Sequence, residues 1–182
     1  MTQYARPVAD KADDTNWSST DESGGSTVYY TAIDESSASD SDYITGDGSG
    51  GSAIQIDFEL TNGLTDPSVT TGHKLIVRYN TDGSSSDATL TIRLMEGSTV
   101  RMTDDVDVSG VTSYTTRTYA PTNTTGSIGS YDNMFLRLIF EDGDASDNVY
   151  ISQAYVEVPS PSAGGSDAVP VALNTYRQMR ER

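Results

Sequence analysis

Carboxylates are almost the only side chains in this sequence whose type and spacing could do chemistry. The chain has one histidine, His73, and no cysteine. A Ser–His–Asp triad or a histidine-bound metal would have to use His73, which stands between a turn and an alternating apolar stretch. We expect it to be an ordinary surface histidine that enters a strand. The lack of cysteine excludes a thiol nucleophile, a disulfide framework and a zinc–thiolate site.

Paired carboxylates occur at several turns and resemble the pairs that glycosidases use. The pairs are Asp13/Asp14, Asp34/Glu35, Asp104/Asp105 and Asp142/Asp144. In a chain this acidic, such pairs are expected to be solvated turn residues. The sequence also lacks the motifs for activated serine, phosphate or dinucleotide binding. We therefore predict that the protein is not an enzyme and that it has no cofactor.

The best candidate for a cation site is the loop that contains Asp142, Asp144 and Asp147. Alternating oxygen ligands suit calcium, but Asp147 stands where an EF-hand loop needs glycine, and Gln153 replaces its bidentate glutamate. An acidic hairpin turn explains the same composition. We predict a plain turn here, with calcium as the weaker alternative.

Aromatic residues offer a second kind of chemistry, because the faces of their rings can stack on sugars. The chain has eleven tyrosines and one tryptophan. Several of the tyrosines lie on predicted strands: Tyr29, Tyr30, Tyr114, Tyr119, Tyr150 and Tyr155. Some of these must belong to the core, and the remainder could form a glycan-binding platform.

The net charge restricts the partners. The chain carries 27 acidic and 11 basic residues, a formal net charge of -16. Nucleic acid and anionic membranes would be repelled, because binding them depends on lysine and arginine. The charge favours solubility or a basic partner. We expect no nucleic-acid and no membrane binding. The polar first residues predict no signal peptide, and the absence of cysteine suits a protein made in a reducing cytoplasm.

Strands must position all of these side chains. The clearest pattern is residues 54–61, where apolar and polar side chains alternate with the period of a half-buried strand. Similar but shorter patterns follow. The predicted strands are residues 28–33, 42–45, 54–61, 74–79, 89–94, 100–103, 112–119, 133–140 and 148–158. Turn residues separate them, and no helical periodicity interrupts them. We predict an all-β antiparallel sandwich or jelly roll of about eight or nine strands.

Two arms are expected to flank the sandwich of residues 28–159. Residues 1–27 are polar, and we expect them to form an N-terminal arm that carries either one short strand or a docking segment around the lone Trp17. A Gly/Ser/Pro linker at 160–168 leads to a C-terminal anchoring tail at 169–182. A short tail cannot fold alone, so it is either frayed or held by a partner. The candidate partner-binding residues are Trp17, Val171, Leu173, Tyr176, Arg177, Met179 and Arg180.

Three stretches together resemble a known group of proteins. Residues 28–35 and 40–44 resemble a "Y-x-x-I-D-E … D-x-D-Y-I" opening. Residues 65–67 and 72–79 resemble "D-P … G-H-x-L-x-x-R-Y", and residues 149–159 resemble a closing "V-x-I-S-x-A-x-x-E-x-P". The combination is similar to small all-β structural proteins of the virions of tailed bacteriophages. These motifs are structural, so the resemblance implies no catalytic residues.

The resemblance implies a bacteriophage virion protein that assembles in the bacterial cytoplasm. Within that group we expect a capsid decoration or cement protein, bound to the major capsid protein lattice through its terminal arms. The partners would be the major capsid protein or other virion proteins, with the chain lattice-bound or homo-oligomeric. Two alternatives stay open: a neck or tail component of the virion, and a glycan-binding receptor-attachment domain that resembles a carbohydrate-binding module.

Overall fold

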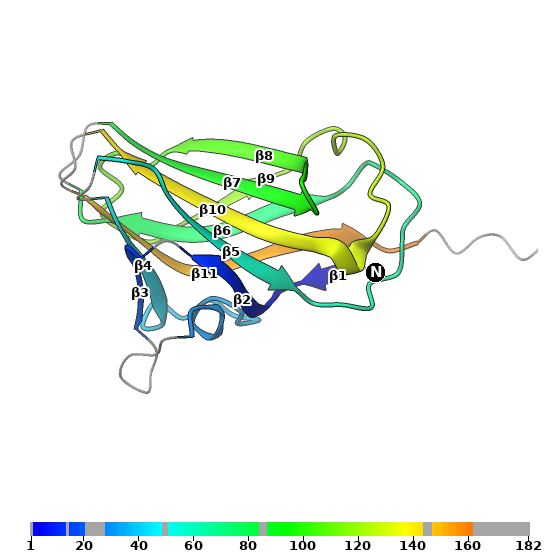
Figure 1. Ribbon diagram of the computed structural model, residues 1–182, viewed down its shortest axis with the longest axis horizontal. Coiled ribbons are helices and arrows are strands. Elements are labelled where there is room, and N and C mark those ends of the chain that lie inside the picture. The colour runs from blue at the N-terminus through cyan, green and yellow to red at the C-terminus, as the bar shows by residue number, and fades with distance from the viewer. Residues whose placement is uncertain are drawn as a thin grey trace, which may run out of the picture.

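The protein is a β-sandwich of two antiparallel sheets (Figure 1). The computed structural model describes residues 2–13, 15–20, 28–48, 51–83, 87–143 and 147–161. Eleven strands and two short 3-10 helices, η1 and η2, lie within these residues. The predicted fold class is confirmed.

The first sheet, called sheet A here, has six strands in the order β3-β4-β11-β6-β9, with β1 paired to the end of β11. Their bounds are β1 Thr2–Ala5, β3 Trp17–Thr20, β4 Tyr43–Asp47, β6 Lys74–Thr81, β9 Thr115–Tyr119 and β11 Asn148–Pro159. β1 and β4 share one edge of β11, because β1 pairs with its last residues and β4 with its first.

The second sheet, sheet B, has five strands in the order β2-β5-β10-β7-β8. Their bounds are β2 Pro7–Asp13, β5 Ile54–Leu60, β7 Ala88–Glu96, β8 Thr99–Asp107 and β10 Met134–Asp142. The short helix η2, Tyr131–Asn133, leads directly into β10. Two register shifts interrupt the pairing of β2 with β5.

The core lies between the sheets and follows the alternation in the sequence. Ile54, Ile56, Phe58 and Leu60 on β5 are all buried, and their polar neighbours point to the outer face of sheet B. The same holds for the alternating apolar residues of β6 and β7. Burial of these side chains supplies the main favourable free energy of folding.

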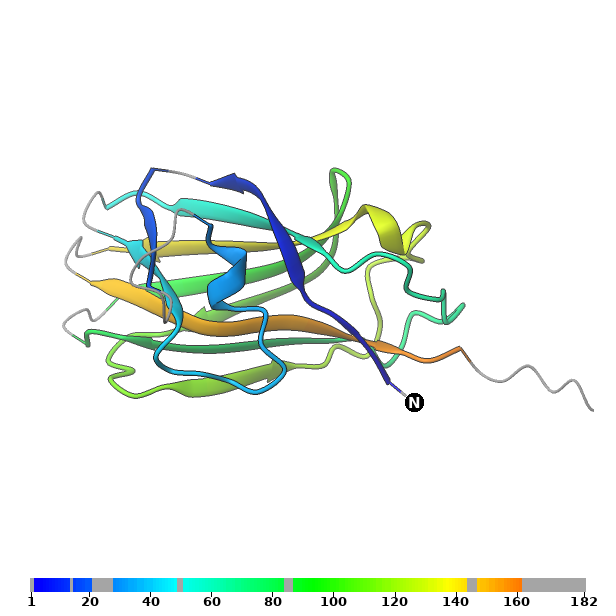
Figure 2. The same ribbon diagram turned by 90° about the horizontal axis from the view of Figure 1, so that it is seen from below.

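The prediction of a strand at residues 28–33 is wrong. This segment contains η1, Tyr30–Ala32, which is visible on the near side in Figure 2. The Asp10 carboxylate accepts the backbone N–H groups of Tyr29 and Tyr30, at 2.9 and 2.8 Å. These two hydrogen bonds hold the segment along the edge of the sandwich. There the backbone carbonyl of Ile33 accepts a hydrogen bond from the backbone N–H of Ala154. Its apolar residues reflect burial there rather than strand pairing.

The N-terminal arm is also corrected, because residues 2–20 supply β1, β2 and β3 of the two sheets. The sandwich therefore begins near residue 2 rather than at residue 28. Trp17 is only 4% exposed. It sits opposite Gly46 on β4, where an added Cβ would come within 2.9 Å of its ring. A polar sequence concealed this role because β2 and β3 are edge strands with one wet face.

Candidate functional site

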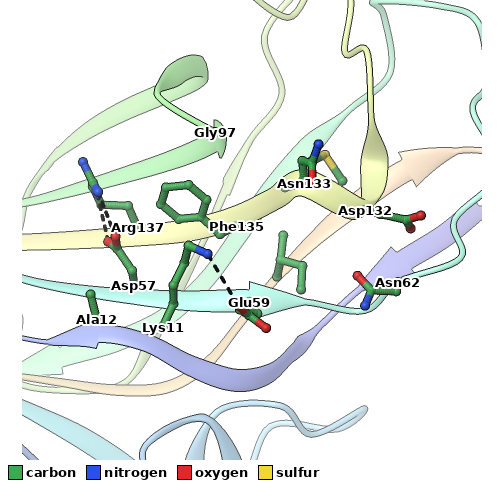
Figure 3. A pocket seen from close by; sticks show the side chains of 12 residues that line it. Lys11, Ala12, Asp57, Glu59, Asn62, Gly97, Asp132, Asn133, Phe135 and Arg137 are labelled. Carbon is green, nitrogen blue, oxygen red and sulfur yellow. Dashed lines mark hydrogen bonds and ion pairs between the residues drawn. The ribbon is translucent and has the colours of Figure 1, made fainter.

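A hollow lies on the outer face of sheet B (Figure 3). We call it the groove. Its volume is about 680 Å³. It is lined by Lys11, Ala12, Asp57, Glu59, Leu60, Asn62, Gly97, Asp132, Asn133, Met134, Phe135 and Arg137.

Strand alternation explains why polar side chains meet in the groove. β5 turns its apolar residues inward, which leaves Asp57 and Glu59 on the outer face. On the neighbouring strand β10, Arg137 pairs with Asp57, and Phe135 pairs with Glu59. Directly opposite residues on one face of a sheet lie about 5 Å apart at Cβ, so their side chains meet.

An ion pair holds the centre of the groove. Arg137 donates from Nε and Nη2 to the two carboxylate oxygens of Asp57, at 2.8 and 2.7 Å. Asp57 is 3% exposed, and this bidentate contact raises the pKa of Arg137. A buried carboxylate needs such a partner, because removing it from water is costly. The pair therefore fixes the position of both side chains.

An aromatic ring and a second ion pair form the adjoining part of the groove. Lys11 lies 3.4 Å from Glu59, and its ammonium group is 5.3 Å from the centre of the Phe135 ring. The Arg137 guanidinium is 5.4 Å from the same ring. Figure 3 shows the ring between the two cations. Both distances allow cation–π attraction, which helps to orient the two cations.

The end of the groove carries amides and a third carboxylate. Asp132 accepts the backbone N–H of Gly63 at 2.8 Å. Asn62 and Asn133 lie nearby with their amide groups (Figure 3). The groove thus combines an apolar floor with both donors and acceptors of hydrogen bonds.

The predicted cation loop is used for structure. Asp142 is fully buried and accepts the backbone N–H of Asp147 at 2.7 Å, which closes the turn between β10 and β11. Asp147 is buried as well. Asp144 lies outside the described residues. Within the described part of the chain, no three His, Cys, Asp or Glu side chains are grouped as a metal ion would require.

His73 is not the surface histidine that we expected. It is 1% exposed, and its Nε2 atom lies 2.8 Å from the hydroxyl of Tyr131. Burial lowers the pKa of His73 and raises that of Tyr131 to about 12. The pair joins the start of β6 to η2, a structural role that the polar turn before His73 did not indicate.

Some of the tyrosines lie together on the outer face of sheet A. Tyr43 and Tyr150 meet edge to face at 5.5 Å, and Tyr4 and Tyr155 at 6.0 Å. Arg6 lies over the ring of Tyr155, at 4.7 Å. The faces and edges of these rings are therefore largely in contact with one another and with the arginine of the protein itself.

Of the other tyrosines singled out in the sequence, Tyr114 belongs to this face, where Arg78 lies 5.5 Å from its ring. Tyr29, Tyr30 and Tyr119 pack against the core instead.

The remaining predicted sites do not form a cluster. Asp104 is paired with Arg117 across the open edge of the sandwich, at 2.7 and 2.9 Å. Trp17 is buried, so it is not displayed for a partner. The tail candidates Val171, Leu173, Tyr176, Arg177, Met179 and Arg180 lie outside the described residues, and their role stays a prediction. No helix in the described part of the chain has the length and apolar character of a membrane span.

Sequence reasoning missed the groove. The alternation at residues 54–61 identifies Asp57 and Glu59 only as polar strand positions, and Lys11 falls in the expected N-terminal arm. A signal was present in Arg137, a charged residue in the middle of the most apolar strand, β10. Charged residues at such central positions require a partner.

No family model and no curated protein matches this chain. Solved structures do. A cyclase from Fischerella sp. TAU has a TM-score of 0.49 and 15% identity, over 87% of this chain and 91% of that one. The CBM36-1 domain of a multidomain xylanase, from the hindgut metagenome of Trinervitermes trinervoides, has a TM-score of 0.43 and 10% identity, over 89% and 99%.

The arabinose-bound MgGH51 α-L-arabinofuranosidase has a TM-score of 0.48 and 15% identity over 83% of this chain. The chain spans only 25% of that enzyme's length. All three likenesses are likenesses of fold.

Proposed function

We propose that this protein is a non-catalytic carbohydrate-binding domain and that the groove is its sugar site. The observation that carries the proposal is the lining of the groove. Carboxylates, amides, an ammonium and a guanidinium surround a small apolar floor in a hollow of about 680 Å³. Sites for small ligands generally have volumes of about 300–1,000 Å³.

The mixture of donors and acceptors matches a polyhydroxylated ligand. Most small-molecule sites are mainly apolar, with a few polar groups for orientation. Here polar side chains predominate, and several are planar groups that can engage two neighbouring hydroxyls at once: Asp132, Asn62, Asn133 and Arg137. A sugar hydroxyl both donates and accepts, so a ring with several hydroxyls would satisfy such a lining.

The proposal is one of binding without catalysis, because two carboxylates of the groove already have partners. A glycosidase needs a pair of carboxyl groups that flank the scissile bond and are free to act on it. Asp57 accepts two hydrogen bonds from Arg137, and Glu59 lies 3.4 Å from Lys11. Each of these carboxylates is therefore engaged within the protein itself.

A glycan array followed by calorimetry would test the proposal. We expect the full chain to bind a set of oligosaccharides, and Asn62→Ala with Asn133→Ala to weaken binding about tenfold, the effect of losing one or two hydrogen bonds. Thr118→Ala, an exposed position on the outer face of sheet A, should bind like the unmodified protein. An array without any hit, or equal binding by both variants, would contradict the proposal.

The virion role remains a prediction from the sequence resemblance. A glycan-binding domain is compatible with the receptor-attachment alternative, in which the protein contacts a host surface. Capsid decoration instead depends on the C-terminal segment at residues 169–182. Binding of the full chain to purified capsids, compared with Tyr176→Ala and Met179→Ala together, would separate the two roles.

A further inference from the structure

One arginine beside the groove has no partner among the residues that the structure describes. Arg93 lies on β7, directly opposite Arg137 on β10. The outer face of sheet B there has a row of four side chains: Asp57, Arg137, Arg93 and Thr103. Arg93 therefore extends the polar row from the groove towards β8.

The Arg93 guanidinium is unpaired within the described residues. No ion pair, side-chain hydrogen bond or ring contact involves it. The carboxylate on the nearest diagonal position, Asp105, accepts a hydrogen bond from Thr91 at 2.7 Å. Six other lysine and arginine side chains of the described part each have a carboxylate partner, and the seventh, Arg6, is held against Tyr155 and a backbone carbonyl.

The placement of Arg93 is unfavourable for the protein alone. Like charges that lie directly opposite each other on a sheet destabilise it. Asp57 compensates only one of the two guanidinium groups. Arg137 uses Nε and Nη2 for Asp57, which leaves its Nη1 group outside the pair. The two arginines together present donors and no acceptor.

We propose that Arg93 and Arg137 form an anion-binding subsite of the groove. The sugar that the groove binds would then carry a carboxylate, as a uronic acid does. A planar carboxylate accepts two hydrogen bonds and matches the fork of a guanidinium. This inference rests on the proposed carbohydrate binding and adds the class of sugar. A neutral sugar has no group that would compensate the second arginine.

The net charge of -16 does not oppose this subsite at short range. At physiological ionic strength, charges further than about 8 Å from the ligand are largely screened. Near the subsite, Arg93 faces the ligand with its full charge. The overall charge should instead slow the approach of an acidic sugar at low salt.

Calorimetry with matched pairs of ligands would test the subsite. The ligands are trisaccharides of galacturonic, glucuronic and mannuronic acid, each with its counterpart in which the carboxylates are reduced to alcohols. We expect at least one acid to bind ten- to a hundred-fold more tightly than its reduced counterpart, as charge-assisted hydrogen bonds would give. Arg93→Gln should remove this difference.

Two controls accompany the measurement. Lys74→Gln makes the same change in net charge on the opposite sheet and should keep the preference for the acid. The urea midpoint of Arg93→Gln should not fall, since the side chain has no partner to lose among the described residues. If neutral sugars bind and no acid is preferred, or if Arg93→Gln keeps the preference, the subsite is refuted while carbohydrate binding stands. If no sugar binds at all, both proposals fail.

Discussion

At the scale of single residues, Asp57 decides the character of the groove. It is the buried acid of a row that also holds two arginines, and it can neutralise only one of them. Its bidentate contact fixes Arg137 in place, and Arg137 in turn lies near the Phe135 ring. Side chains that are already held in place lose little conformational entropy when a ligand binds.

Glu35 allows a prediction about pH. Burial raises its pKa to about 7, with the neighbouring acids Asp34 and Asp42 adding to the shift. The folded protein then keeps a proton on Glu35 that the unfolded chain releases near pH 4.5. Because this pKa is raised on folding, Glu35 does not reduce the free energy of unfolding below about pH 4.5. Its destabilising contribution grows as the pH rises from there towards 7. Glu35→Gln should therefore stabilise the protein at pH 8 by about 1 kcal/mol, after discounting for solvent screening.

Urea unfolding at pH 4 and at pH 8 measures this effect. The gain from Glu35→Gln should be absent at pH 4, where the carboxyl group is protonated in both states. Glu141→Gln, at an exposed position, controls for the change in net charge. An equal gain at both pH values would show that Glu35 titrates normally.

At the scale of the elements, the bulges of β2 shape one side of the groove. The pairing of β2 with β5 shifts between Pro7 and Ala9 and again between Asp10 and Ala12. A bulge redirects side chains and increases the local twist of a strand. Lys11 falls within the second shift and reaches across to Glu59 and Phe135. An edge strand with ideal pairing would place it differently.

Trp17 gives the prediction that belongs to β3 and β4. We expect Trp17→Ala to reduce the free energy of unfolding by about 3–5 kcal/mol, the usual cost of removing a large buried aromatic. Far-UV circular dichroism during urea unfolding is the suitable measurement, because the chain has no other tryptophan. Tyr4→Ala, at a position 48% exposed, should cost much less. An unchanged midpoint for Trp17→Ala would restore the picture of a free N-terminal arm.

At the scale of the whole molecule, the acidic charge opposes folding. A chain with a formal net charge of -16 repels itself most when it is compact. Salt screens this repulsion, and it also weakens the surface ion pairs, which are worth only about 0–1 kcal/mol each. We expect the repulsion to dominate, so the Tm should rise by about 2–4 °C, equivalent to about 1 kcal/mol, between low salt and about 0.5 M NaCl. A falling Tm in a thermal scan would mean that the ion pairs dominate.

The sequence by itself determined the fold class and the position of most strands. Residues 54–60 show why: alternation is a local pattern, and a strand must bury one side whatever its neighbours are. The same argument gives a wrong prediction at residues 28–33, where the apolar side chains are buried at the edge of the sandwich without forming a strand. It also misses Trp17, which is buried although its sequence neighbours are polar.

Only the tertiary structure determined where the groove lies and that Arg93 has no partner among the described residues. Asp57 and Arg137 are 80 positions apart in the chain, and Arg93 meets them only because β7 and β5 flank β10. The order of strands depends on the packing of both sheets together, which no single segment encodes. For that reason the sequence could show which strand positions are exposed to solvent. It could not show which of these side chains lie side by side, or that the charge of Arg93 is not compensated by a neighbour.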